Sequence, residues 1–203
     1  MSMKTTPYWW EDEPRDAASK IAPPAKVDVA IVGAGYTGLS AALVLARSGL
    51  SVAVFEAGQL GEGASSRNGG MVGPSFHKLG IAGLKAQYGV DKTNEILKES
   101  VGFVDFLEDF LKTEKIDADF KRTGRFLGAL KPAHYDTMAA GLEDLQTACG
   151  VKGEMVTKSA LESETGSAKF FGGLVFHQDG GLHPAKYHSG LVAKVREGYR
   201  CCG

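Results

Sequence analysis

The hydrophobic pattern near the start of the chain switches between short apolar runs and helical spacing. Val27 to Val32 is a short run rich in β-branched residues, which is typical of a buried parallel strand. A helix follows, indicated by apolar residues at Leu39, Ala42, Leu43 and Ala46. Gly49 is expected to close this helix, and Ser51 to Phe55 is predicted to be a second strand. The order strand, helix, strand predicts the core of a doubly wound α/β sheet.

The later pattern alternates amphipathic helices with short strands. Asp91 to Thr113 is predicted to be a helix, with Asp91 as its N-cap. Arg125 to Leu130 and Gly173 to His177 are predicted strands, and Pro132 to Cys149 is a predicted helix. One face of the first helix carries Ile96, Leu97, Val101, Val104, Leu107 and Leu111.

Turn residues mark off the shorter segments. Gln59 to Gly73 is rich in Gly and Ser without periodicity, so it is predicted to be a loop. Ser159 to Glu162 matches a capping box at the start of a short helix, and Gln178 to Gly181 is a predicted turn. Pro184 is expected to open the last helix.

Composition narrows the class of protein. The 203 residues carry a net charge of -1, and 43% of them are hydrophobic, so the chain is an ordinary globular one with no basic excess for nucleic acid. Three cysteines form neither a disulfide framework nor a CxxC zinc pair, so a cytoplasmic location and no metal are expected. Val27 to Ala46 is long enough for a membrane span, but Asp28 and three glycines interrupt it.

The turn after the first strand carries a dinucleotide-binding fingerprint, Gly33-Ala34-Gly35-Tyr36-Thr37-Gly38. Gly33 permits the tight turn, and Gly35 lets the backbone approach a pyrophosphate. Gly38 allows close packing of the helix, whose free N–H groups face the phosphate charge. Tyr36 and Thr37 lie inside the same turn and belong to the predicted site.

An acidic residue completes the fingerprint. Glu56, followed by Ala57, ends the second strand 23 residues after Gly33, where a carboxylate accepts hydrogen bonds from ribose hydroxyls. A 2′-phosphate would be repelled there, which disfavours NADP. FAD and NAD share this recognition, so the fingerprint alone does not separate them.

The segment after Glu56 carries a resemblance to a known family. Val29 to Gly38 and the run Gly61 to Val72 (GEGASSRNGGMV) together resemble the D-amino-acid oxidase-like family of FAD-dependent oxidoreductases. The aromatic start Tyr8-Trp9-Trp10 is most similar to its γ-glutamylputrescine oxidase branch. Weaker resemblance extends through Phe120–Ala129 and Asp179–Tyr187.

The resemblance implies a cofactor and the residues that contact it. The loop would line the pyrophosphate and the isoalloxazine of FAD through backbone N–H groups. Arg67 either contacts phosphate or lies in solvent, and Met71 follows the loop. No His lies between Glu56 and Val72, which favours non-covalent flavin, and His77 is expected to be structural. The loop residues implied are Ala64, Ser65, Asn68, Gly69 and Gly70.

The resemblance also implies a domain organisation. Residues 1–25 are expected to be an extended arm whose aromatic residues pack on the domain surface. Residues 26–115 would form the first part of an FAD/NAD-binding, Rossmann-like three-layer domain, and residues 116–180 the beginning of an α+β substrate domain. Residues 181–203 would return as a helix with a tail.

The implied reaction is oxidation of the C–N bond of an amine or amino acid by hydride transfer to flavin N5, with O₂ or another acceptor reoxidising the flavin. The sequence assigns no catalytic residue; Arg125 could bind a carboxylate, and His177 and His183 flank a turn, but all three are expected to be structural. Family members are about twice this length, so a truncated chain is expected, with Cys201-Cys202 in an artefactual tail. A non-catalytic fragment with weak or no FAD binding, and an NAD-dependent dehydrogenase, are the alternatives.

Overall fold

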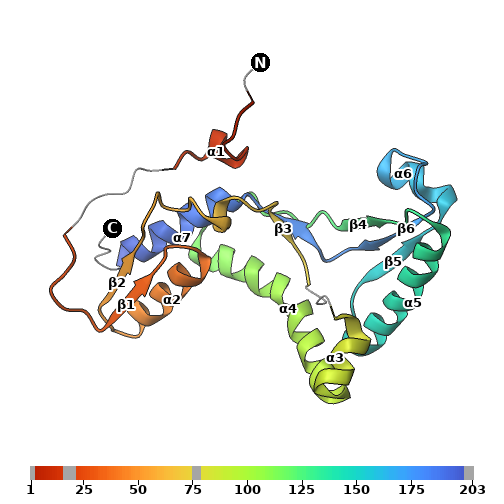
Figure 1. The fold of residues 1–203 in the computed structure, drawn as a ribbon, viewed down its shortest axis with the longest axis horizontal. Coiled ribbons are helices and arrows are strands. Elements are labelled where there is room, and N and C mark those ends of the chain that lie inside the picture. Colours follow the sequence, from red (N-terminus) through yellow and green to blue (C-terminus); the bar gives the residue numbers. More distant parts are fainter. Residues whose placement is uncertain (1–2, 16–21, 75–78, 199–203) are drawn as a thin grey trace. The chain divides into compact units, whose positions relative to one another are not determined.

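The computed structural model describes residues 3–15, 22–74 and 79–198, which form two compact units (Figure 1). The first unit comprises Met1–Gly70, Phe110–Phe120 and Leu182–Gly203, and the second comprises Met71–Asp109 and Lys121–Gly181. The predicted segment boundaries at residues 115 and 180 stay a prediction. His77 and the Cys201-Cys202 pair lie outside the described residues.

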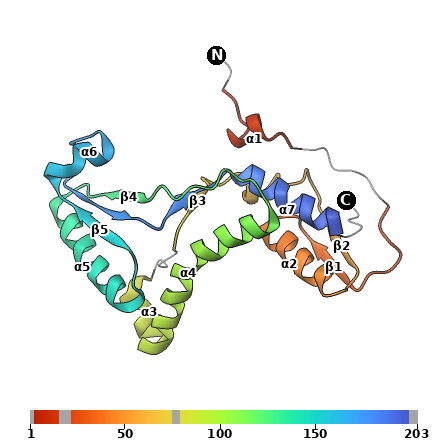
Figure 2. The same cartoon turned by 180° about the vertical axis from the view of Figure 1, so that it is seen from behind.

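The first unit is a βαβ unit with an added helix. Strands β1 and β2 run parallel, with partners from Val29↔Val52 to Val32↔Phe55, and α2 connects them. Helix α7 packs against α2 (Figure 2). The bounds are β1 Val29–Val32, α2 Tyr36–Arg47, β2 Val52–Phe55 and α7 Pro184–Gly198. This arrangement is the predicted α/β, partial Rossmann-like fold.

The apolar faces of α2 and α7 are the predicted ones. Gly49 follows α2 with φ +86°, a left-handed conformation that glycine adopts without strain, as expected for the residue that closes this helix. On α7, Leu191 and Val195 are buried. The α2 residues that are buried are Leu39, Ala42, Leu43 and Ala46.

The arm differs from its prediction in one respect. It contains a helical turn, α1 (Trp9–Asp12), rather than only extended chain. Trp9 forms an edge-to-face contact with the ring of His183, 4.8 Å between centroids. The predicted packing of the aromatic residues on the domain surface is therefore observed. The contact holds Trp9 beside the start of α7, since His183 directly precedes that helix.

The second unit packs helices against a small antiparallel sheet. Its strand order is β4-β6-β5, and α5 lies along β5 and β6 (Figure 2). Strands β3 and β7 form a separate antiparallel pair. The helix α4 continues from this unit into the first. The bounds are β3 Met71–Val72, α3 Gly80–Tyr88, α4 Val90–Glu114, β4 Arg125–Gly128, α5 Pro132–Cys149, β5 Gly153–Val156, α6 Leu161–Thr165, β6 Gly173–Phe176 and β7 Gly180–Gly181.

One hydrophobic core stabilises the second unit. It joins the predicted apolar faces of α4 and α5 to strand β6, because helical and strand periodicities each turn one face inward. Its buried members are Leu84, Leu97, Leu142, Leu145, Val151, Leu174 and Phe176.

Several local predictions were wrong. Asp91 is not an N-cap, because α4 already begins at Val90, and Thr93 Oγ1 donates to Gly89 O near its start. Ser159 is not a cap either: a 3₁₀ turn, Lys158–Ala160, precedes α6, whose N-cap Ala160 has no side chain to accept a hydrogen bond. The loop after β2 is also less irregular than predicted, since it contains the 3₁₀ turn Ala64–Ser66 and strand β3.

Candidate functional site: a dinucleotide-binding turn and its loop

The turn between β1 and α2 is tight because its glycines leave no room for side chains. Gly33 has φ +95°, and its N–H donates to Phe55 O at 2.7 Å, which joins the turn to β2. A Cβ added to Gly38 would lie 2.0 Å from Gly33 O. Helix α2 can therefore approach the turn closely only with glycine at position 38.

The N-terminus of α2 has the chemistry of an anion site. Gly35 is its N-cap and has no side chain to cap the first-turn N–H groups. The Tyr36 N–H donates to Ser65 Oγ at 3.0 Å, and a Cβ on Gly35 would lie 3.1 Å from that oxygen. The fingerprint and the following loop are thus in contact, at a helix terminus whose partial positive charge favours phosphate.

Glu56 is tied to the same turn. Its Oε2 accepts from Ala34 N at 2.8 Å, and its Oε1 accepts from Ala57 N at 2.8 Å and from Gly58 N at 3.2 Å. The Ala34 N–H in particular holds the pKa of the Glu56 carboxyl below its usual range, against the effect of burial. A carboxylate accepts about four hydrogen bonds, so an ionised Glu56 keeps one acceptor position beside the turn.

Asn68 organises the predicted flavin loop from within. Its Nδ2 donates to Ala64 O at 3.1 Å and to Ser65 O at 3.2 Å, while its Oδ1 accepts from Gly70 N at 2.9 Å. Gly70 has φ +69°, and an added Cβ would lie 2.2 Å from Leu182 O. The loop is therefore a folded turn with a fixed end, and the Asn68 side chain makes its hydrogen bonds to the backbone of the loop itself.

The remaining residues of the predicted site lie near or at the surface. Arg67 is exposed, its Nε donates to Glu62 O at 2.6 Å, and its guanidinium lies 4.5 Å from the centroid of the Trp10 ring. Its contact with a phosphate stays a prediction. Thr37 and Gly69 are exposed. Met71 is 80% exposed and belongs to the second unit.

Tyr36 fastens α2 to α7. Its hydroxyl donates to Pro184 O at 2.9 Å, and its ring lies 4.9 Å from that of Tyr187. Burial raises the pKa of Tyr36 to about 12, so the hydroxyl remains a donor at neutral pH.

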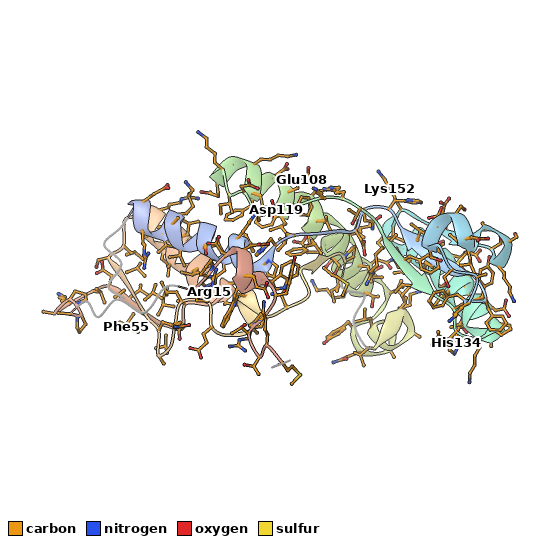
Figure 3. All side chains as sticks on the ribbon, turned by 90° about the horizontal axis from the view of Figure 1, so that it is seen from above. Arg15, Phe55, Glu108, Asp119, His134 and Lys152 are labelled. Atoms are coloured by element: carbon orange, nitrogen blue, oxygen red, sulfur yellow. The ribbon has the colours of Figure 1, made fainter. Side chains whose placement is uncertain are left out.

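Sequence reasoning did not single out His188 or Arg15. His188 is fully buried on α7, and its Nε2 lies 2.7 Å from Ala34 O in the dinucleotide turn. Arg15, labelled in Figure 3, lies with its side chain 3% exposed near the end of the arm. His188 precedes Leu191 and Val195 at helical spacing, so its place on a buried face was the available signal.

Arg125, His177 and His183 have partners within the protein, in line with the structural roles expected of them. Arg125 Nε lies 2.8 Å from Asp179 Oδ2, and the guanidinium lies over the Phe176 ring. Buried His183 contacts Trp9, and exposed His177 has Nε2 3.4 Å from Glu154 Oε1. Among the described residues, no group of three or more His, Cys, Asp or Glu side chains is placed to hold a metal ion. No helix of the described part has the length and apolarity of a membrane span.

Comparison with known proteins places the chain in a family. Residues 28–200 match the model of the DAO family, described as FAD dependent oxidoreductase. The chain is 31% identical over 169 residues to γ-glutamylputrescine oxidoreductase of Escherichia coli K12, which covers 83% of this chain and 39% of that protein. It is 33% identical over 166 residues to the probable oxidoreductase OrdL of Haemophilus influenzae, covering 81% and 38% respectively.

A solved structure agrees with the fold. Glycine oxidase from Geobacillus kaustophilus superposes with a TM-score of 0.67 at 22% identity, over 87% of this chain and 45% of that one. The fold is thus that of an α/β flavoprotein of the class that the family model describes, the FAD-dependent oxidoreductases. The chain belongs to the DAO family of FAD-dependent oxidoreductases. It spans about two fifths of the length of the curated relatives that it matches.

Proposed function

We propose that this chain forms the FAD-binding part of an oxidoreductase that oxidises the C–N bond of an amine or amino acid. The observation that carries the proposal is the convergence of Gly35, Glu56 and Ser65 on the N-terminus of α2. Similarity to γ-glutamylputrescine oxidoreductase supports a small-molecule amine as the substrate class. O₂ or another acceptor would take the electrons afterwards.

The residues present fit FAD in chemical terms. The uncapped first turn of α2 and the Cβ-free approach at Gly35 suit a pyrophosphate, and Glu56 suits the ribose hydroxyls. The backbone of Ala64–Gly70 would face the flavin side, held in shape by Asn68. When bound, FAD would supply the redox chemistry by accepting a hydride from the carbon that bears the amine.

The first experiment is the visible absorption spectrum of the purified chain with FAD added, before and after acid precipitation. A flavin spectrum that moves entirely into the supernatant supports non-covalent FAD. A yellow pellet contradicts the non-covalent part, and a preference for NAD over FAD in competition contradicts the cofactor.

Substitution locates the site. Gly35→Val places a side chain against Ser65 Oγ and in the path of the pyrophosphate, so we expect FAD affinity to fall at least about tenfold. Gly141→Val is the control, because nothing lies within 4 Å of a Cβ at Gly141, on α5. Equal FAD retention by wild type and Gly35→Val would contradict the assignment of the FAD site to this turn.

A second candidate is a non-catalytic fragment with weak or no FAD binding. The observation that favours it is the β1–β2 pair, which has two strands in the described residues and leaves Val32 91% exposed. A chain that is folded by circular dichroism but stays colourless at saturating FAD supports this candidate.

A further inference from the structure

The arm before the first strand is attached to the predicted flavin loop by both of its tryptophans. Trp9 Nε1 donates to Asn68 O at 2.8 Å, and Trp10 Nε1 donates to Ser66 Oγ at 2.7 Å. Ser66 is fully buried and in turn donates to Gly61 O. The Arg67 guanidinium covers the Trp10 ring. Residues about 60 positions apart in sequence therefore fix the backbone of the same short loop.

A second contact joins the end of the arm to the helix that supports the dinucleotide turn. Arg15 Nη2 donates to Ser189 Oγ at 3.2 Å, and Nη1 lies 3.5 Å from His188 Nδ1. The same guanidinium donates to Glu13 O, from Nη2 at 2.9 Å and from Nε at 3.2 Å. An arginine with 3% of its side chain exposed is thus surrounded by acceptors on the arm and on α7.

His188 transmits this contact to the fingerprint. Its Nε2 faces the carbonyl of Ala34, which can only accept, so Nε2 carries the hydrogen and Nδ1 is the acceptor that faces Arg15. Gly61 lies at the same point with φ +75°, and a Cβ there would be 2.7 Å from His188 Nδ1 and 2.9 Å from Arg15 Nη1. The arm, the loop and the dinucleotide turn therefore meet at one buried position.

We propose that the arm, Tyr8–Arg15, is a strap that holds the dinucleotide turn and the flavin loop in their cofactor-binding shape. Trp9, Trp10, Arg15 and His188 act as positioning residues, since each contacts the backbone or a buried side chain of these segments. The proposal rests on the proposed function for its consequence, tighter FAD binding. Its structural part, the ordering of the loop, holds with or without the cofactor.

The first test separates the hydrogen bonds of the tryptophans from their bulk. Trp9→Phe with Trp10→Phe keeps the rings and removes both N–H donors. Tyr8→Phe is the matched control, because it removes a polar group from a 69% exposed ring of the same arm. In the cofactor-free chain, hydrogen exchange of the Ser66, Arg67 and Gly70 amides should rise roughly tenfold in the double variant and stay unchanged in the control.

The second test uses rescue at His188. His188→Leu removes the donor to Ala34 O, whereas His188→Gln can return an N–H to it. We expect FAD affinity, measured by flavin fluorescence, to fall about tenfold in His188→Leu and to recover to within about threefold in His188→Gln. Thermal unfolding of the cofactor-free variants controls for a general loss of stability.

The outcomes distinguish the strap from the proposed function. Unchanged loop exchange in the double Trp variant would overturn the strap, whether or not FAD binds. A wild-type chain that binds no FAD would contradict the proposed function. Faster hydrogen exchange of the loop amides in the double Trp variant would still support the strap in that case. A loss of affinity equal in His188→Leu and His188→Gln would overturn the assigned role of the Nε2 donor.

Discussion

At the scale of single residues, Gly38 is the position in the dinucleotide turn that tolerates least change. A Cβ there lies 2.0 Å from Gly33 O and 3.3 Å from Ile31 Cγ2, and the first of these is a backbone atom that cannot rotate away. Gly38→Ala should therefore lower the free energy of unfolding by about 1–3 kcal/mol through overpacking. Urea denaturation followed by circular dichroism measures this change.

Gly141 supplies the control, because it is also a helical glycine but a Cβ there meets nothing within 4 Å. Gly141→Ala should raise the free energy of unfolding by about 0.4–1 kcal/mol, since alanine has the higher helix propensity. A neutral Gly38→Ala would mean that α2 does not pack against the turn as closely as the structure has it.

At the scale of elements, an ion pair joins α2 to the end of α4 within the first unit. Arg47 donates from Nη1 to Glu114 Oε1 at 2.8 Å and from Nη2 to Glu114 Oε2 at 2.7 Å, and Glu114 is 7% exposed. The Arg47 guanidinium holds the pKa of the Glu114 carboxyl below its usual range, against burial. Arg47→Leu should lower the free energy of unfolding by about 1–3 kcal/mol at pH 7, because it leaves a buried carboxylate without its charged partner.

The stabilisation by the Arg47–Glu114 pair should depend on pH. Because the folded-state pKa of Glu114 is lowered, the stabilisation is present above its unfolded-state pKa of about 4.3. It is lost as the pH falls through the lower folded-state pKa. The difference between wild type and Arg47→Leu should therefore shrink at acid pH in urea titrations. Lys92→Leu is the control, since Lys92 and its partner Glu95 are 63% and 67% exposed and an exposed pair of this kind contributes little to stability.

Element prediction followed the strength of the local pattern. Helix α5 occupies the predicted residues, Pro132–Cys149, because a proline at its start and Gly150 in the left-handed conformation at its end mark both termini. Helix α3 and strand β5 were missed. Each is short, and each is stabilised by packing against α4, α5 or β6 that no local window contains.

At the scale of the whole molecule, the small β1–β2 sheet predicts self-association. In the described part of the chain these strands pair only with each other, and Val32 is 91% and Phe55 39% exposed. Unpaired strand edges beside apolar side chains favour edge-to-edge pairing. We expect concentration-dependent association in sedimentation velocity, reduced by Val32→Lys.

The control for this prediction lies on a helix. Val44 on α2 is 64% exposed, so Val44→Lys removes a comparable apolar side chain without touching a strand edge. Equal effects of the two substitutions would assign the association to general hydrophobicity. A monomeric wild type at high concentration would contradict the role of the sheet edges.

The βαβ order, the glycine turn and the acid that follows β2 could be predicted from the amino-acid sequence, because these features depend on local spacing and on residue types with few conformational alternatives. The sequence also indicated the family, through Val29–Gly38 together with the run from Gly61 to Val72. The contacts of His188, Arg15, Trp9 and Trp10 were visible only in the tertiary structure. Their contacts join segments 56 to 174 positions apart, and no sequence period records which distant backbone a buried donor will meet.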